Sequence, residues 1–229
     1  MSNDVNQTGR AMQFKKVIAG AFYYVYENRA ALARALAWPF LAFVLIDAAY
    51  YLEVEGGMAF FTAVASIGIQ AVFAITTHRV VLLGPGSVSK WGLTSWTKRE
   101  TFFLLHIIAL AFLVLPVFLL GLIPVLGSVA ALVVACWLTG RLSLVFPGIA
   151  IDKGVSFKLS WKLTRSHQGL MFLVVIAFPI LLAVPTVLFG FVPYTFFLSS
   201  LVSTFVIVFE VAALSMAYQL ITDEAYGNG

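Results

Sequence analysis

Residues Thr101–Leu120 read TFFLLHIIALAFLVLPVFLL, and His106 is the only ionisable side chain in this stretch. A helix needs about 20 predominantly apolar residues to cross the roughly 30 Å hydrocarbon layer of a bilayer. This stretch meets that requirement. A helix that is apolar all round also suits lipid better than the surface of a soluble protein. The stretch therefore predicts a transmembrane helix.

The composition of the whole chain agrees with this prediction. Hydrophobic residues make up 62% of the 229 residues and charged residues only 10%, with a mean hydropathy of +1.00. A soluble domain carries about 25% charged residues, so most of this surface cannot face water. Disorder and nucleic-acid binding are excluded by the same figures, and the single cysteine, Cys136, excludes an internal disulfide framework.

Five other stretches are long and apolar enough to cross a bilayer: Ala30–Leu52, Met58–Leu83, Val125–Ile151, Gly169–Gly190 and Phe197–Ile221. We therefore predict an all-α fold, a polytopic membrane helix bundle with six transmembrane helices. The bundle forms one membrane domain over residues 14–221, with cytoplasmic tails at 1–13 and 222–229. The pattern R-x-x-L-x-x-P-G, at Arg79 and again at Arg141, indicates tandem units that each contain a helical hairpin.

The basic residues fix the predicted orientation. Of the 14 lysines and arginines, all except Arg141 lie before or at the start of the first span or around the second and fourth connections, and Arg141 lies inside a span. Basic residues concentrate on the cytoplasmic side of membrane proteins. We therefore expect both termini in the cytoplasm, and a bacterial inner (plasma) membrane as the location.

Two segments near the basic connections predict amphipathic helices at the cytoplasmic surface, at residues 14–28 and 155–166. In the second, Trp161 lies beside a basic stripe of Lys158, Lys162 and Arg165. Aromatic and basic stripes side by side suit anionic lipid headgroups. The alternative is an ordinary cytoplasmic loop that follows the positive-inside rule. Small hydroxyl residues on the remaining face favour close packing against a neighbouring helix.

The polar residues inside the spans predict a buried polar centre. Arg141 and Glu210 lie about 15–20 Å from the cytoplasmic ends of their spans at 1.5 Å per residue, and Gln70 lies at a similar depth. A charge at this depth needs a partner. We expect Arg141 to pair with Glu210, with Gln70 nearby. Such a pair marks a transport path or fixes the helix register, and we favour the second interpretation.

Small residues recur at every fourth position in the fourth span, at Gly127, Ala131, Ala135, Thr139 and Ser143. Small faces let helix backbones approach closely in lipid, so this stripe predicts a helix contact. The second span carries a similar but more polar stripe that includes Gln70 and His78. A polar groove is the alternative interpretation there.

No pattern of catalytic or metal-ligating residues is present in the sequence. The three histidines have no ligand-like spacing, and neither a phosphate-binding glycine loop nor G-x-S-x-G occurs. We therefore expect no enzymatic activity and no cofactor.

The stretch Gly140–Arg165, GRLSLVFPGIAIDKGVSFKLSWKLTR, carries a family pattern. A span ends in R-x-x-x-x-x-P, a short turn follows, and S-W-x-L-T-[RK] leads into the next span. This pattern resembles poorly characterised bacterial inner-membrane proteins and the membrane domain attached to some glycerophosphodiester phosphodiesterases. The resemblance implies a six-span bundle without an assigned reaction, and it implies no catalytic residues because the phosphodiesterase domain is absent.

Two functional hypotheses follow from the sequence. The first is a non-enzymatic membrane component that binds anionic lipid headgroups or organises a membrane protein partner. The second is a small-solute or lipid transporter that uses Arg141 and Glu210. A closed apolar core around the pair favours the first hypothesis, and an open polar vestibule favours the second.

Overall fold

The computed structural model describes residues 2–51, 57–89, 91, 96–123, 125–190 and 196–227. Every regular element in this part of the chain is helical, which confirms the all-α prediction. The elements are α1 (Ser2–Glu27), α2 (Arg29–Ala35), α3 (Ala37–Tyr51), α4 (Gly57–Leu83), η1 (Pro85–Ser87), α5 (Lys98–Val114), η2 (Leu115–Leu122), α6 (Leu126–Leu142), α7 (Val145–Ala150), α8 (Phe157–Leu163), α9 (Gln168–Phe172), η3 (Leu173–Ala177), α10 (Phe178–Gly190) and α11 (Phe196–Tyr226).

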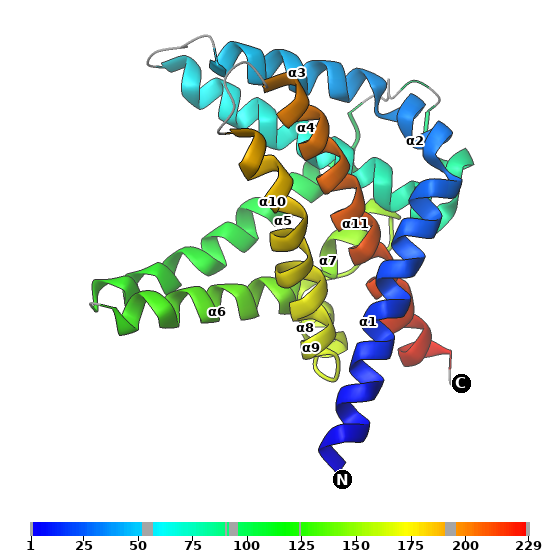
Figure 1. Ribbon diagram of the computed structural model, residues 1–229, viewed down its shortest axis with the longest axis vertical. Helices are drawn as coiled ribbons and strands as arrows, with labels where there is room; N and C mark the ends of the chain where they lie inside the picture. The colour runs from blue at the N-terminus through cyan, green and yellow to red at the C-terminus, as the bar shows by residue number, and fades with distance from the viewer. Residues whose placement is uncertain are drawn as a thin grey trace.

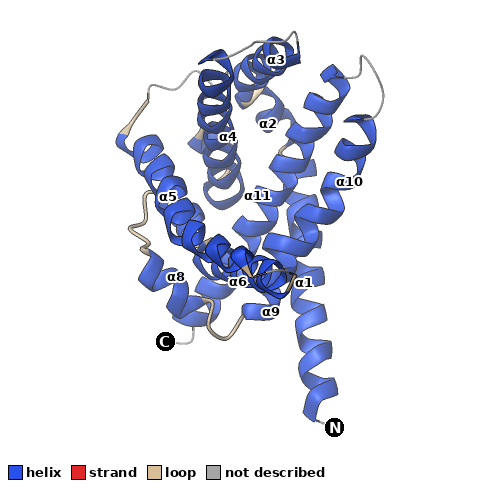
Figure 2. Cartoon of the chain, turned by 90° about the vertical axis from the view of Figure 1, so that its left-hand side faces the viewer, coloured by secondary structure: helices blue, strands red, loops and turns tan. Residues whose placement is uncertain are grey.

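Three antiparallel helix pairs form the frame of the molecule: α3 with α4, α5–η2 with α6, and α10 with α11 (Figure 1). In Figure 2, α5 and α10 lie on opposite sides of the view, with α11 between them. Residues 52–56, between α3 and α4, and residues 191–195, between α10 and α11, lie outside the described residues.

Five helical segments are long and apolar enough to cross a membrane: Ala59–Leu83, Lys98–Leu122, Leu126–Ala150, Gln168–Leu188 and Leu198–Tyr226. The first predicted span is instead divided into α2 and α3, which meet at an angle of 56°. Pro39 explains this break, because it has no N–H to donate to the carbonyl of Ala35. The described chain is thus all-helical, with five helices long and apolar enough to cross a membrane, or six if the bent pair is one span.

Two other helices change type next to a proline. The α-helix changes to a 3₁₀ helix at Leu115, directly before Pro116, and a short π-helical segment precedes Pro179. Such local changes are the usual consequence of a missing backbone donor.

The termini are more ordered than the sequence predicts. The predicted tail 1–13 and the predicted interfacial segment 14–28 form one continuous helix, α1, which packs along α11 through Val17, Ala21 and Val25. Likewise α11 continues to Tyr226, past the predicted boundary at residue 221. The start of α1 and the end of α11 lie on the same side of the molecule (Figure 1).

The buried core lies toward the end of the bundle that carries the basic residues. Its largest fully buried side chains include Phe73, Leu144 and Leu170. At the opposite end, the α5–η2 and α6 pair exposes large apolar side chains, with Leu122 at 82% and Leu126 at 78%. An apolar surface of this kind is typical of a helical hairpin in lipid.

Candidate functional site: a basic pocket at α6 and α8

The helix α8 is held against the end of α6 by hydroxyl groups. Ser156 begins α8 as its N-cap, accepting from the Leu159 N–H at 3.2 Å. Ser160 and Thr164 are both fully buried, and their hydroxyls lie 2.8 Å and 3.1 Å from the carbonyl oxygen of Arg141. The Thr164 hydroxyl shares its proton between this carbonyl and that of Ser160, which is 2.8 Å away. The Arg141 carbonyl is among the last four of α6, which have no partner within the helix. The expected close packing of the hydroxyl face is confirmed.

The Arg141 side chain turns toward α8 and is almost fully enclosed, with 3% of its surface exposed. Its Nη2 donates to the backbone carbonyl of Trp161 at 2.6 Å. The guanidinium carbon lies 4.4 Å from the centre of the Trp161 ring, a cation–π distance. Nε and Nη1 are buried and donate to no acceptor among the described residues.

Two tryptophans stand beside this arginine. The rings of Trp137 on α6 and Trp161 on α8 pack edge to face, with centroids 5.0 Å apart and planes at 82°. The Trp137 indole N–H donates to Gln168 at 3.4 Å. Both rings keep part of their surface exposed, 43% and 38%. Half-exposed tryptophans with a polar end suit the boundary between lipid and water.

An open cavity of about 720 Å³ lies over these residues. Its cationic lining comes from Arg141, Lys158, Lys162 and Arg165. The rest of the lining is Trp137, Ser156, Leu159, Trp161 and Gln168, so no carboxylate is among the lining residues. We call this site the α6–α8 pocket. It combines cations and aromatic rings in the way that anionic headgroups at a membrane surface require.

The expected Arg141–Glu210 pair is not present. Arg141 interacts with Trp161, and none of the ion pairs within 4 Å among the described residues includes Glu210. Glu210 is half-buried on α11, while Gln70 lies on the exposed surface of α4 and not in a buried centre. The predicted polar centre of three residues is therefore wrong for this structure.

The helix packing explains this correction. The main neighbours of α6 are α5, η2, α8 and α9, whereas those of α11 are α1, α3, α4 and α10. The chain turns sharply after α7, where Asp152 has a positive φ of 60°, and this turn lets α8 fold back against Arg141. Arg141 consequently lies at the level of the predicted interfacial helix and not half a span away from it.

The two small-residue stripes have different outcomes. In α6, Gly127, Ala131 and Ala135 are buried and α6 packs tightly on η2, so the predicted helix contact is confirmed. In α4, the stripe is buried only at its basic end, at His78. The exposure of Gln70 argues against a polar groove along this helix.

A second polar cluster, which the sequence did not predict, ties α4 and α5 to the turn after α7. Asp152 accepts from Arg79 at 2.9 Å and from Arg99 at 3.2 Å. Arg79 also donates to the carbonyl of Ala150 at 3.0 Å, and Arg99 pairs with Glu100 at 3.1 Å. These basic residues are neutralised within the fold, unlike those of the α6–α8 pocket.

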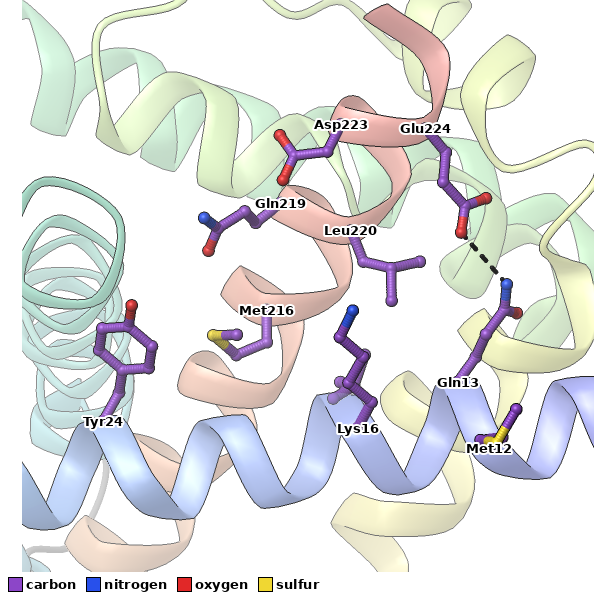
Figure 3. Close-up of a pocket in the computed structure, with 10 residues that line it drawn as sticks. Met12, Gln13, Lys16, Tyr24, Met216, Gln219, Leu220, Asp223 and Glu224 are labelled. Carbon is purple, nitrogen blue, oxygen red and sulfur yellow. Dashed lines mark hydrogen bonds between the residues drawn. The ribbon is translucent and has the colours of Figure 1, made fainter. Parts of the chain in front are cut away.

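A groove of about 570 Å³ runs between α1 and the end of α11 (Figure 3). Lys16 reaches into it from α1, and Asp223 and Glu224 face it from α11. Gln13 donates to Glu224 at 3.3 Å, and His167 lies 3.4 Å from the other oxygen of that carboxylate. Because the groove carries both signs of charge, it lacks the uniform character of the α6–α8 pocket.

Sequence reasoning found four members of the α6–α8 pocket, Lys158, Trp161, Lys162 and Arg165, but assigned Arg141 elsewhere and missed Trp137. A repeated pattern carried the missing information. Trp137 precedes Arg141 by four residues, as Trp161 precedes Arg165, so each pair shares one helix face. The repeated W-x-x-x-R spacing on α6 and α8 was the sequence feature that could have indicated contact between these two helices.

Comparison with known proteins found no matching family model, no similar curated protein and no similar solved structure. The resemblance to bacterial six-span proteins therefore stays a prediction that depends on the Gly140–Arg165 pattern. The proposed function therefore depends on the fold and on the lining of the α6–α8 pocket.

Proposed function

We propose that this chain is a six-span protein of a bacterial inner membrane that binds anionic phospholipid headgroups in the α6–α8 pocket. The observation that carries the proposal is the pocket lining, which gathers four cations and two tryptophans without a carboxylate. A lysine or arginine near an anionic leaflet contributes about 1 kcal/mol of binding free energy. Several cations at one site therefore favour anionic over zwitterionic lipid.

The proposed topology places the pocket in the cytoplasmic leaflet. If α2 and α3 together form one span, six spans put both termini on the same side, as the distribution of basic residues requires. Reporter fusions after Lys90 and after Lys158 test this topology. Both reporters should be cytoplasmic, and reporters on opposite sides would contradict it.

Lipid retention by the purified full-length chain tests the binding proposal. The protein is extracted in neutral detergent, mixed with phosphatidylglycerol or phosphatidylcholine, and the retained lipid is counted by native mass spectrometry. We expect clear retention of phosphatidylglycerol over phosphatidylcholine. Equal retention of the two lipids would contradict the proposal.

A matched pair of variants locates the binding. Lys158→Gln/Lys162→Gln and Lys15→Gln/Lys16→Gln each remove two exposed cations. The first pair should reduce phosphatidylglycerol retention by more than tenfold, at about 1 kcal/mol for each lysine. The second pair should leave retention close to that of the parent protein. An equal effect of both pairs would mean that net charge, and not the pocket, attracts the lipid.

The transporter hypothesis receives less support from the geometry. It depended on Arg141 and Glu210 as a shared polar centre, and the two residues lie on helices with different neighbours. Flux into proteoliposomes still tests it directly. Wild type and Glu210→Gln should give the same background flux, and a loss of flux in the variant would favour transport.

A further inference from the structure

The four cations of the α6–α8 pocket are not balanced by any acidic residue in its lining. Arg79 and Arg99 at the same end are balanced, because the two arginines pair with the two carboxylates of Asp152 and Glu100. Lys16 likewise shares its groove with two carboxylates (Figure 3). The charge of the α6–α8 pocket thus exceeds what one singly charged phosphodiester can neutralise.

Arg141 strengthens this argument because it lies behind the exposed cations. Two of its donor groups, Nε and Nη1, are enclosed without an acceptor among the described residues. Burying a donor of a charged group without an acceptor costs more free energy than leaving the same donor exposed to water. Guanidinium groups form their strongest hydrogen bonds with carboxylate and phosphate oxygens. The two enclosed donor groups of Arg141 therefore still lack acceptor oxygens at the inner wall of the pocket.

The size of the pocket agrees with a ligand that carries more than one phosphate charge. A volume of about 720 Å³ falls within the range of sites that enclose drug-sized ligands. The edge-to-face pair of Trp137 and Trp161 gives an apolar wall beside the cations. Such a wall can pack against the glycerol and upper acyl part of a lipid, whereas a free phosphate has no apolar surface to pack against it.

We infer that the α6–α8 pocket selects phospholipids whose headgroup region bears at least two negative charges, either as a phosphomonoester or as two phosphodiesters. This inference rests on the proposed binding of anionic lipid at the same site. The exposed lysines and Arg165 attract the headgroup, and Arg141 supplies the enclosed donors for its innermost oxygens.

Competition between lipids at equal total charge tests the selection. The full-length chain is placed in phosphatidylcholine nanodiscs that contain phosphatidylglycerol, phosphatidic acid or cardiolipin, each adjusted to the same negative charge. Native mass spectrometry then counts the lipid that stays bound. We expect at least about fivefold greater retention of the two multiply charged lipids, the effect of one additional charge contact. Equal retention of all three anionic lipids would overturn the inference and leave the proposed function intact, whereas retention of none would overturn both.

Variants test whether Arg141 contributes to the selection. Arg141→Lys keeps the charge but loses the planar set of donors, so the preference should fall toward that for phosphatidylglycerol. Because this variant changes a buried position, the exposed variant Arg165→Gln provides a second measurement and should also reduce the preference. Lys16→Gln, in the groove of mixed charge, is the matched control and should leave the preference unchanged. An unchanged preference in both Arg141→Lys and Arg165→Gln would overturn the assignment to this pocket.

A soluble competitor distinguishes lipid from free phosphate as the source of this chemistry. Glycerol 3-phosphate is added to nanodiscs that contain phosphatidic acid, up to a large molar excess over the lipid. Retention of phosphatidic acid should stay constant, because the tryptophan wall contacts only the lipid. Displacement at concentrations comparable with that of the lipid would overturn the assignment to a membrane lipid.

Discussion

Arg141 and Trp161 interact twice, through a 2.6 Å hydrogen bond from the guanidinium group to the backbone carbonyl and through a ring 4.4 Å from the guanidinium carbon. The first interaction attaches α6 to the backbone of α8, and the second encloses the charge. An arginine in a membrane helix needs such compensation, because leaving it unpaired in hydrocarbon is costly. In this fold the compensation comes from an aromatic ring and a carbonyl instead of a carboxylate.

The ring of Trp161 should therefore stabilise the fold as well as line the pocket. Trp161→Leu removes the cation–π contact and the packing on Trp137, and we expect it to cost about 1–3 kcal/mol of unfolding free energy. Trp161→Phe keeps an aromatic face and should cost less. The apparent melting temperature in detergent measures both changes.

Trp38→Leu is the control for this prediction, because half of the Trp38 surface is exposed. An exposed substitution of this kind changes stability by about 0.5 kcal/mol or less. Equal decreases in melting temperature for Trp38→Leu and Trp161→Leu would show that the Arg141 contact contributes nothing.

The carbonyl of Arg141 gives a second prediction, because Ser160 and Thr164 both donate to it. Ser160→Ala or Thr164→Val alone leaves one donor, so each should cost about 1 kcal/mol. The double variant leaves a buried carbonyl without a hydroxyl donor and should cost more than the sum of the two. A double-mutant cycle on the free energy of unfolding measures this coupling. Strict additivity would contradict the shared-acceptor geometry, and Ser166→Ala, at an exposed loop position, serves as the control.

The sequence predicts the helical class, the position of most spans and the amphipathic character of α8, because each depends on local hydrophobicity or periodicity. It does not predict the environment of Arg141, which depends on how the chain turns back after α7. Depth along the span placed Arg141 near the bilayer centre, but the turn at Asp152 brings α8 back beside Arg141. The sequence does not predict the Asp152 cluster either, since its members come from three separate parts of the chain.

Two buried hydroxyl groups, Thr77 on α4 and Ser215 on α11, should respond in opposite ways to removal. Ser215 lies 2.7 Å from Nδ1 of His78, and both residues are buried. Ser215→Ala leaves a buried ring nitrogen without this partner, so we expect a cost of about 1–3 kcal/mol. Thr77 is also fully buried, but its hydroxyl has no hydrogen-bond partner among the described residues. Thr77→Val should therefore be neutral or stabilising.

Denaturing-detergent titration of the two variants gives their free energies of unfolding side by side. The comparison is informative because both substitutions remove one hydroxyl from the same buried region. Destabilisation of Thr77→Val as large as that of Ser215→Ala would show that the hydroxyl of Thr77 has a partner in the native protein.

The contact between η2 and α6 gives the last prediction. A Cβ atom at Gly127 would lie 1.9 Å from the carbonyl oxygen of Leu120 and 2.7 Å from Cβ of Ile123. Neither neighbour is the end of a flexible side chain, so Gly127→Ala must move the backbone and should cost about 1–3 kcal/mol. Gly68→Ala is the matched control, because a Cβ at Gly68 meets nothing within 4 Å. Alanine is also the better helix former, by about 1 kcal/mol, so Gly68→Ala should be neutral or stabilising. The melting temperatures of both variants in the same detergent test this prediction. Equal melting temperatures would mean that small residues in α6 do not determine how closely η2 packs against it.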